Sequence, residues 1–220
     1  MPFVIYPLSK ISIFDVLICI LMETIITDIN SLDLSKSYTY ADYLTWNFKE
    51  RLEILKGKVF KMSPAPSRKH QEISVELTGI FYNYFKKTPC NVYVAPFDVR
   101  LKNFKKSTSD KEITTVFQPD ICVICDKEKL DDRGCLGAPD LIIEILSPGN
   151  SKKEMDIKFD LYEENAVKEY WIVEPYQKSI LIYTLQKDKY IGLKPIAEEG
   201  LVHSPLFPEL SFNVADIFID

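Results

Sequence analysis

The chain has 220 residues, of which 46% are hydrophobic and 27% are charged, and this composition excludes a fibrous or wholly disordered protein. The length predicts one domain with one well-filled core. The formal net charge of −5 means that no basic field covers the whole surface, so contact with nucleic acid would need a local basic patch or metal ions.

The amino-terminal segment 11–29 is apolar, but Asp15 and Glu23 interrupt it, and its longest uninterrupted part is too short to cross a bilayer. A signal peptide is also disfavoured, because Lys10 is the only basic residue ahead of that part and no small-residue cleavage site follows it. We therefore expect a cytoplasmic protein without stable membrane association.

The chain divides into two parts at residue 30. We interpret 1–30 as an amino-terminal extension that is either spurious or poorly ordered, because Met22 opens a segment that is a plausible soluble beginning. The remainder, 31–220, is interpreted as one domain.

The first half of this domain shows three periodic segments. Thr39 caps the start of a short helix whose side chains Tyr40, Tyr43 and Leu44 are spaced to pack inward. Residues 51–62 alternate between apolar and polar side chains around Lys56-Gly57, which predicts two strands joined by a tight turn. Residues 67–85 carry apolar side chains on one face of a predicted helix.

The second half is richer in strands. Residues 92–101 predict a strand pair or one bent strand, and a polar loop follows. The most apolar strands, 117–125 and 140–146, are expected at the centre of a sheet that is covered on both faces, with a turn between them. Residues 151–165 return to helical spacing, and two closing strands over 170–174 and 180–185 surround Pro175. This order predicts an α/β (α+β) domain with a central mixed β-sheet flanked by helices.

The five cysteines do not form a metal or disulfide pattern. Their odd number argues against a secreted disulfide framework, and the CxxC pair Cys122 and Cys125 lies in an apolar strand without a second pair. A zinc or thiol-redox protein remains a distant alternative, because the only histidines are His70 and His203. We interpret the cysteines as core thiols.

Carboxylates inside the two apolar strands are the main functional signal. Side chains alternate faces along a strand, so Glu144 shares one side of its strand with Asp140, and Asp120 belongs to the neighbouring strand. A buried ionised carboxylate needs a cationic partner, hydrogen bonds or a metal ion. Two acids at one rim predict a site for Mg²⁺ or Mn²⁺, which would neutralise charge on a phosphodiester. Among the nearby lysines, Lys158 is the best candidate to assist the attacking water.

Several motifs together resemble a known family. The segments are SYTYADYL, RLEILKGKVFKMSPAPSRKHQ, APFDVRL, the Pro119-Asp120 pair, GAPDLIIEILSP, D-x-K-x-x-x-Y and VKEYWIVEP, and they extend from about residue 38 to about residue 185. This combination resembles the Uma-type restriction-endonuclease-like family, a branch of the PD-(D/E)XK nuclease superfamily. The resemblance implies a restriction-endonuclease-like core with Asp120 and Glu144 as metal ligands, and with Glu53 as an additional acidic ligand.

The sequence departs from the superfamily pattern at one position. A lysine is expected two residues after the second acid, but Leu146 stands there. The resemblance suggests that the catalytic lysine has moved to the following helix, at Lys158.

Each candidate residue also has a purely structural interpretation. Asp120 could be held by backbone amides at a strand start, and Glu144 could form a buried ion pair with Arg100 or Lys158. Glu53 could be a solvent-facing hairpin residue, and Asp140 a local hydrogen-bonding residue. The remaining candidates with bland alternatives are His70 at a helix start, the core aromatics Tyr170 and Trp171, and the lysine clusters 102–106 and 152–153.

Two functions compete on this basis. The first is a metal-dependent endonuclease that hydrolyses DNA phosphodiester bonds, in which Asp120, Glu144 and Glu53 hold Mg²⁺ or Mn²⁺ and Lys158 assists the water. The second is a catalytically inactive binding or assembly module with the same fold. DNA is the expected substrate, and a homodimer is one arrangement that nucleases cutting both strands commonly use.

Overall fold

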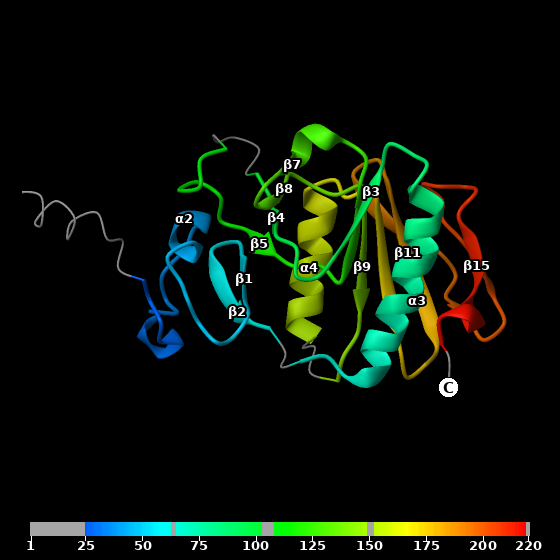
Figure 1. The fold of residues 1–220 in the computed structure, drawn as a ribbon, viewed down its shortest axis with the longest axis horizontal. Coiled ribbons are helices and arrows are strands. Elements are labelled where there is room, and N and C mark those ends of the chain that lie inside the picture. The colour runs from blue at the N-terminus through cyan, green and yellow to red at the C-terminus, as the bar shows by residue number, and fades with distance from the viewer. Residues whose placement is uncertain (1–24, 63–64, 103–107, 149–151, 219–220) are drawn as a thin grey trace, which may run out of the picture.

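The computed structural model describes residues 25–62, 65–102, 108–148 and 152–218 (Figure 1). Ile26 forms a bridge with Trp46, and Ile29 is buried. The packed part of the chain therefore begins before residue 31, while residues 1–24 of the expected extension lie outside the described residues. Over the described ranges, no helix is long and apolar enough to cross a membrane.

A central mixed sheet is confirmed. In spatial order its strands are β12 (Lys189–Gly192), β11 (Ser179–Gln186), β10 (Glu169–Glu174), β9 (Leu141–Ile145), β6 (Ile121–Ile124) and β3 (Asn91–Val94), and β13 (Ile196–Ala197) pairs with β11. Strands β9 and β10 are parallel, and the other neighbours are antiparallel. The two acid-bearing segments thus meet side by side, because β6 pairs directly with β9.

A second sheet was not foreseen. Its order is β2 (Lys58–Lys61), β1 (Leu52–Leu55), β5 (Val116–Phe117), β4 (Val99–Arg100), β8 (Gly134–Leu136) and β7 (Leu130–Asp131). The expectation of a simple turn between the two central strands is wrong, because β7, β8 and the 3₁₀ helix Lys127–Lys129 lie there. The hairpin predicted around Lys56-Gly57 is confirmed, since β1 and β2 pair antiparallel across it.

The predicted strand 117–125 is in fact two strands in different sheets. β5 ends at Phe117 and pairs with β1 and β4, whereas β6 begins at Ile121 and pairs with β3 and β9. Pro119 lies between them and has no N–H to give to a ladder, which favours a break at this point. The three residues Gln118 to Asp120 therefore connect the two sheets.

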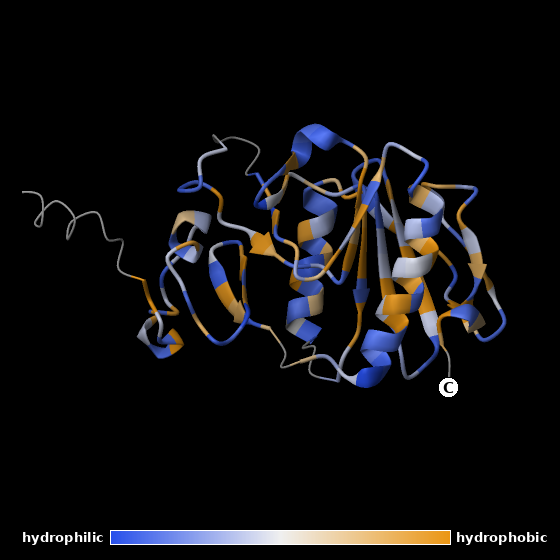
Figure 2. Cartoon of the chain, in the orientation of Figure 1, coloured by the Kyte–Doolittle hydropathy of each residue, from blue (hydrophilic) through white to orange (hydrophobic). Residues whose placement is uncertain are grey.

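Two long helices cover opposite faces of the seven-stranded sheet. Helix α3 (Arg68–Phe85) is capped by Ser67, whose side chain accepts a hydrogen bond from the His70 N–H. It packs on one face of the sheet together with β14 (Leu201–His203), β15 (Ser211–Asn213) and the 3₁₀ helix Val214–Asp216. Helix α4 (Lys152–Glu164) lies on the other face, between this sheet and the second sheet (Figure 1). Both helices mix hydrophilic and hydrophobic residues, as expected for helices with one buried face (Figure 2).

The amino-terminal part of the domain carries two short helical turns. The 3₁₀ helix Ile29–Ser31 precedes α2 (Tyr40–Tyr43), and Thr39 forms a capping box with Asp42, which confirms the predicted cap. Tyr40 is buried as expected. The inward packing of Leu44 is wrong, because the helix ends before it and its side chain is 49% exposed.

The cysteines are only partly core thiols. Cys90 and Cys125 form a disulfide, which corrects the interpretation for this pair, whereas Cys122 and Cys135 are free and buried. Cys90 directly precedes β3 and Cys125 directly follows β6, so the antiparallel register Asn91 opposite Ile124 brings the two together.

Candidate active site

Strand β9 directs Glu144 toward helix α4. Leu141, Ile143 and Ile145 face the α3 side of the sheet, so the alternation sends Glu144 to the opposite side. There its Oε1 accepts hydrogen bonds from the Tyr162 hydroxyl at 2.6 Å and from the Lys158 ammonium at 3.2 Å. Both donors come from α4, one turn apart.

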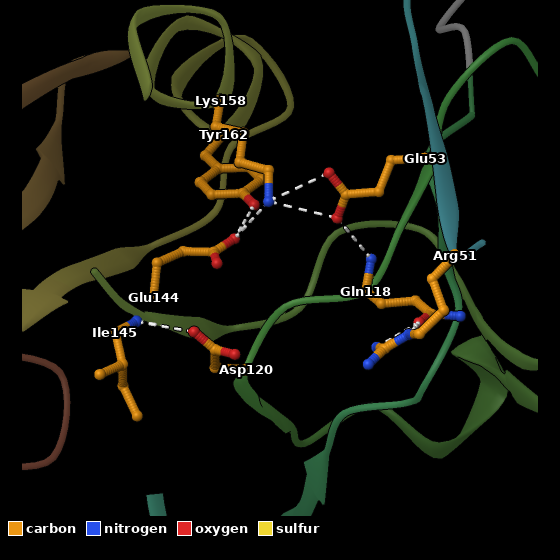
Figure 3. A network of polar contacts seen from close by, with 8 residues as sticks. All are labelled: Arg51, Glu53, Gln118, Asp120, Glu144, Ile145, Lys158 and Tyr162. Atoms are coloured by element: carbon orange, nitrogen blue, oxygen red, sulfur yellow. Dashed lines mark hydrogen bonds and ion pairs between the residues drawn. The ribbon is translucent and has the colours of Figure 1, made fainter. Parts of the chain in front are cut away.

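Lys158 lies between two carboxylates that belong to different sheets. Its Nζ is 3.2 Å from Glu144 on β9 and 3.2 Å from Glu53 on β1 (Figure 3). Glu53 is only 1% exposed, and it also accepts a hydrogen bond from the backbone N–H of Gln118 at 3.0 Å. Lys158 therefore does not extend into solvent from the helix; it is a buried bridge between the sheets.

Asp120 is fixed beside Glu144 by the backbone of β9. Its Oδ2 accepts from the N–H of Ile145 at 2.8 Å, and Ile145 directly follows Glu144 in the chain (Figure 3). The same oxygen lies 3.3 Å from Nε2 of His70, which is buried at the start of α3. Two elements that are distant in sequence thus hold this carboxylate in place.

A pocket of about 380 Å³ opens over these side chains. All four residues that the sequence singled out line it, namely Glu53, Asp120, Glu144 and Lys158. Helix α3 contributes a wall that includes His70, Gln71, Ser74, Val75 and Thr78. The structure therefore gathers one acid from β1, one from the link before β6, one from β9 and a lysine from α4 at a single concave site.

The electrostatics of the pocket are dominated by an excess of carboxylates. Burial raises the pKa of Glu144 to about 7; the Lys158 charge opposes this rise, and Asp120 and Glu53 add to it. Burial alone would lower the pKa of Lys158, but the carboxylates of Glu144 and Glu53 raise it above its ordinary value. Lys158 is therefore an ammonium, and one ammonium does not neutralise three neighbouring acids.

The pKa values of Tyr162 and His70 are also shifted by burial and by the carboxylates of the pocket. Burial and the neighbouring Glu144 raise the pKa of Tyr162, so its hydroxyl stays protonated and donates to the carboxylate. Burial would lower the pKa of His70, but its hydrogen bond to Asp120 and the charges of Asp120 and Glu144 raise it overall. The neighbouring carboxylates thus favour the protonated form of both side chains.

The donor chemistry fits a hard divalent cation at two of the acids. Mg²⁺ is commonly held by one or two carboxylates, with water and substrate phosphate as the other ligands. Asp120 and Glu144 supply such a pair, and the pKa of Glu144 is raised first by burial and then by the neighbouring charges of Asp120 and Glu53. Across the described ranges, however, no group of three or more His, Cys, Asp or Glu side chains is arranged to hold a metal ion. The fit is therefore to two carboxylates, with Glu53 turned toward Lys158 and Gln118.

Comparison with known families places the chain. A family model described as Uma2, "Putative restriction endonuclease", matches residues 40–215. The chain belongs to the Uma2 family. The matched range contains every residue that lines the pocket and leaves out residues 1–39 and 216–220.

Two further proteins are similar to this chain. A Synechocystis sp. protein described as "Uncharacterized protein slr1290" is 26% identical over 150 residues, which cover 67% of this chain and 74% of the relative. A crystal structure from Anabaena variabilis, described as a putative nuclease belonging to DUF820, superposes with a TM-score of 0.64 at 22% identity and covers 82% of this chain and 97% of that one. At this identity the structural match supports the fold, which is that of a nuclease-like α+β domain.

Of the remaining candidate residues that the structure describes, His70 lines the pocket and the others do not. Asp140, at the opposite end of β9, accepts from the Cys125 N–H and from Lys168, so it is a local structural acid. Tyr170 and Trp171 are buried core aromatics. Of the lysine clusters, 103–107 lie outside the described residues and Lys152 is exposed at the start of α4.

Sequence reasoning missed three polar residues of the site. Tyr162 ends the D-x-K-x-x-x-Y motif but was given no role, yet its hydroxyl donates to Glu144. Gln118 and Arg51 were not singled out, although both line the pocket. The signal for Gln118 was its position in Q-P-D, two residues before Asp120; Arg51 precedes Glu53 by two residues, which is the spacing of side chains on one face of a strand.

Proposed function

We propose that this Uma2-family protein is a metal-dependent endonuclease that hydrolyses DNA phosphodiester bonds in the pocket formed by Glu53, Asp120, Glu144 and Lys158. The observation that carries the proposal is the convergence of three carboxylates and one buried ammonium from four separate elements on one pocket. The acids that line the pocket, Glu53, Asp120, Glu144 and Glu154, outnumber the bases Arg51, Lys158 and His70, and clustered carboxylates with a raised pKa in a pocket are typical of functional sites.

Asp120 and Glu144 are the proposed ligands of Mg²⁺ or Mn²⁺. When bound, such an ion supplies Lewis-acid neutralisation of the charge that builds up on the phosphodiester oxygens. Glu53 was also expected to be a ligand. Its contacts with Lys158 and the Gln118 N–H support a role in holding the lysine, and direct ligation by Glu53 stays a prediction.

Lys158 is the proposed catalytic cation. Its raised pKa keeps it charged at neutral pH, so it acts as a hydrogen-bond donor and not as a base. An ammonium held on two sides by Glu53 and Glu144 can orient the attacking water or stabilise negative charge on the phosphorus oxygens without moving. Tyr162 keeps Glu144 in the matching orientation.

The test is cleavage of supercoiled plasmid by the purified protein in Mg²⁺, compared with EDTA and with the variant Glu144→Gln. We expect metal-dependent nicking or linearisation that falls by at least about 10²-fold in the variant, because the charge of one ligand is removed. Equal cleavage by both proteins would point to a contaminant. Absence of cleavage by the wild type over several metals and substrates would contradict the proposal.

One observation favours a second candidate, a binding or assembly module without catalysis. Lys158 already pairs with two of the acids, which is how such a module would satisfy them. Calorimetry with Mn²⁺ separates the two candidates. Binding that disappears in Asp120→Asn favours the nuclease, and no binding at millimolar Mn²⁺ favours the module.

A further inference from the structure

Arg51 occupies the rim of the pocket on the same side as Glu53. Its backbone carbonyl accepts from the N–H of Met62, so it continues the β1–β2 pairing by one residue, and it stands two residues before Glu53. Side chains two apart on a strand share a face. Arg51 therefore projects toward the pocket, where it is exposed to solvent.

The charge of Arg51 is not cancelled by a carboxylate. Among the ion pairs of the residues that the structure describes, none includes Arg51. Its Nε and Nη2 instead donate to Oε1 of Gln118, at 3.3 and 2.7 Å (Figure 3). A guanidinium carries five N–H donors, and a neutral amide oxygen takes two of them. The remaining donors are available at the pocket rim, where the guanidinium makes no direct ion pair within the described ranges.

Gln118 fixes the direction of this arginine. The amide nitrogen of Gln118 donates to Oδ1 of Asp98 at 2.8 Å, and an ionised carboxylate can only accept. The amide oxygen must therefore face Arg51. The backbone N–H of Gln118 holds Glu53 at the same time, so one residue sets the position of both the rim cation and the buried acid.

An acidic pocket needs such a cation if its ligand is a polyanion. The titratable side chains that line it are the acids Glu53, Asp120, Glu144 and Glu154 and the bases Arg51, Lys158 and His70, of which His70 is buried against Asp120. Lys158 is buried between two of these acids, which leaves Arg51 as the basic group that an incoming strand can reach from solvent. A guanidinium held in a fixed orientation matches a phosphate with two parallel hydrogen bonds.

We propose that Arg51, oriented by Gln118, is a binding site for a backbone phosphate of the nucleic-acid strand, next to the phosphodiester at the carboxylates. This assignment rests on the proposed nuclease function and adds to it the residue that positions the strand. Arg51 is a positioning residue, so its loss acts first on binding and only through binding on cleavage.

The test measures binding of a short fluorescein-labelled DNA duplex by anisotropy in Ca²⁺, over a range of salt, with the duplex checked for intactness afterwards. Arg51→Gln weakens binding by about tenfold and lowers the slope of log Kd against log salt by about one, because one phosphate contact is lost. Arg51→Lys keeps the salt slope but weakens binding by about threefold, since it keeps the charge and loses the planar fork.

The matched control is Arg133→Gln, which removes the same charge from an arginine that is paired with Asp110 at 2.7 Å and does not line the pocket. Wild-type binding in Arg51→Gln, or an equal loss in Arg133→Gln, overturns the assignment. If Arg51→Gln fails to fold by thermal unfolding, Arg51→Lys decides the question. If the wild type cleaves plasmid and Arg51→Gln binds and cleaves equally well, only the phosphate site fails; if the wild type neither binds nor cleaves, the nuclease proposal fails with it.

Discussion

Two glutamates on neighbouring strands of the seven-stranded sheet, the buried Glu169 and the largely buried Glu144, have different surroundings. Glu169, at the start of β10, accepts hydrogen bonds from three neutral donors: the Trp171 indole N–H, the Ser204 hydroxyl and the Leu206 N–H. Glu144, near the end of β9, shares one lysine with Glu53 and lies beside Asp120. Burial is the largest cause of a raised pKa in both.

The two glutamates differ in the charge of their neighbours, and this difference sets Glu144 apart as the proposed functional acid. A raised pKa alone does not separate the two glutamates, because burial penalises any carboxylate charge. Glu169 has its lone pairs satisfied by the segment after β14, and so it attaches that segment to the sheet. Glu144 is distinguished by the like charges of Asp120 and Glu53 beside it, which the proposed metal ion would relieve.

Replacing each glutamate by glutamine, which has nearly the same shape, should have opposite effects at the two positions: a loss of stability at Glu169 and a loss of cleavage at Glu144. Glu169→Gln places an amide NH₂ against at least one buried donor, so the free energy of unfolding falls by about 1–3 kcal/mol while cleavage per folded molecule is kept. Glu144→Gln removes a charge from an over-acidic cluster, so unfolding changes by less than about 1 kcal/mol while cleavage falls by at least about 10²-fold. Denaturant unfolding and plasmid cleavage measure the two effects. Equal loss of stability in both variants would remove the distinction.

The pKa of Glu144, about 7, predicts a pH dependence of cleavage. A metal ligand must be deprotonated, so the rate in sub-saturating Mg²⁺ should rise by about tenfold per pH unit below pH 7 and level off above it. A pH–rate profile measures this limb. A rate that does not change between pH 5.5 and 7 would contradict the raised pKa of Glu144. Saturating Mn²⁺ should move the rise of the rate to lower pH.

The same pKa predicts how stability changes with pH. A carboxyl group whose pKa is higher in the folded state binds its proton more tightly when folded, so its contribution to stability is present at acidic pH and is lost as pH rises through about 7. Glu169 and His70 also have raised pKa values and add to the trend. The decline should therefore be smaller in Glu144→Gln than in the wild type, and this difference isolates Glu144.

The smallest expected effect comes from His70, which contacts a proposed metal ligand without being one. His70→Leu keeps a similar volume and removes the hydrogen bond to Asp120, so Mn²⁺ affinity by calorimetry should fall by about tenfold. His203→Leu is the matched control, because it changes the other histidine, which is exposed on β14. An equal loss in both variants would assign the effect to something other than the orientation of Asp120.

Much of the fold could be predicted because its signals are local. The hairpin, helices α3 and α4 and the two faces of β9 follow from periodicity within one segment, and each lies where the sequence indicated. Lys158 was the preferred lysine near the acids and the family resemblance supported it, although a lysine on a helix is by default a surface residue. Its approach to both Glu53 and Glu144 is a property of the packed fold.

The rest could not be predicted because it depends on contacts between distant segments. Strands β5, β7 and β8 are two or three residues long, which is too short for a period to be seen. The change of sheet does leave a signal, because Gln118, Pro119 and Asp120 interrupt the apolar run, but a prediction of one strand over 117–125 bridges these three residues. The disulfide joins Cys90 to Cys125 across 35 positions and depends on the register of β3 with β6.

The three residues Gln118 to Asp120 have one more consequence. This link crosses from one sheet to the other, and it contacts Glu53 and Arg51 on the first side and Ile145 and His70 on the second. Lys158 also joins the same two sheets, through its ion pairs with Glu53 and Glu144. The residues of the proposed site therefore also join the two sheets: a motion that separated the sheets would break these contacts, and a ligand bound to both sides would oppose that motion.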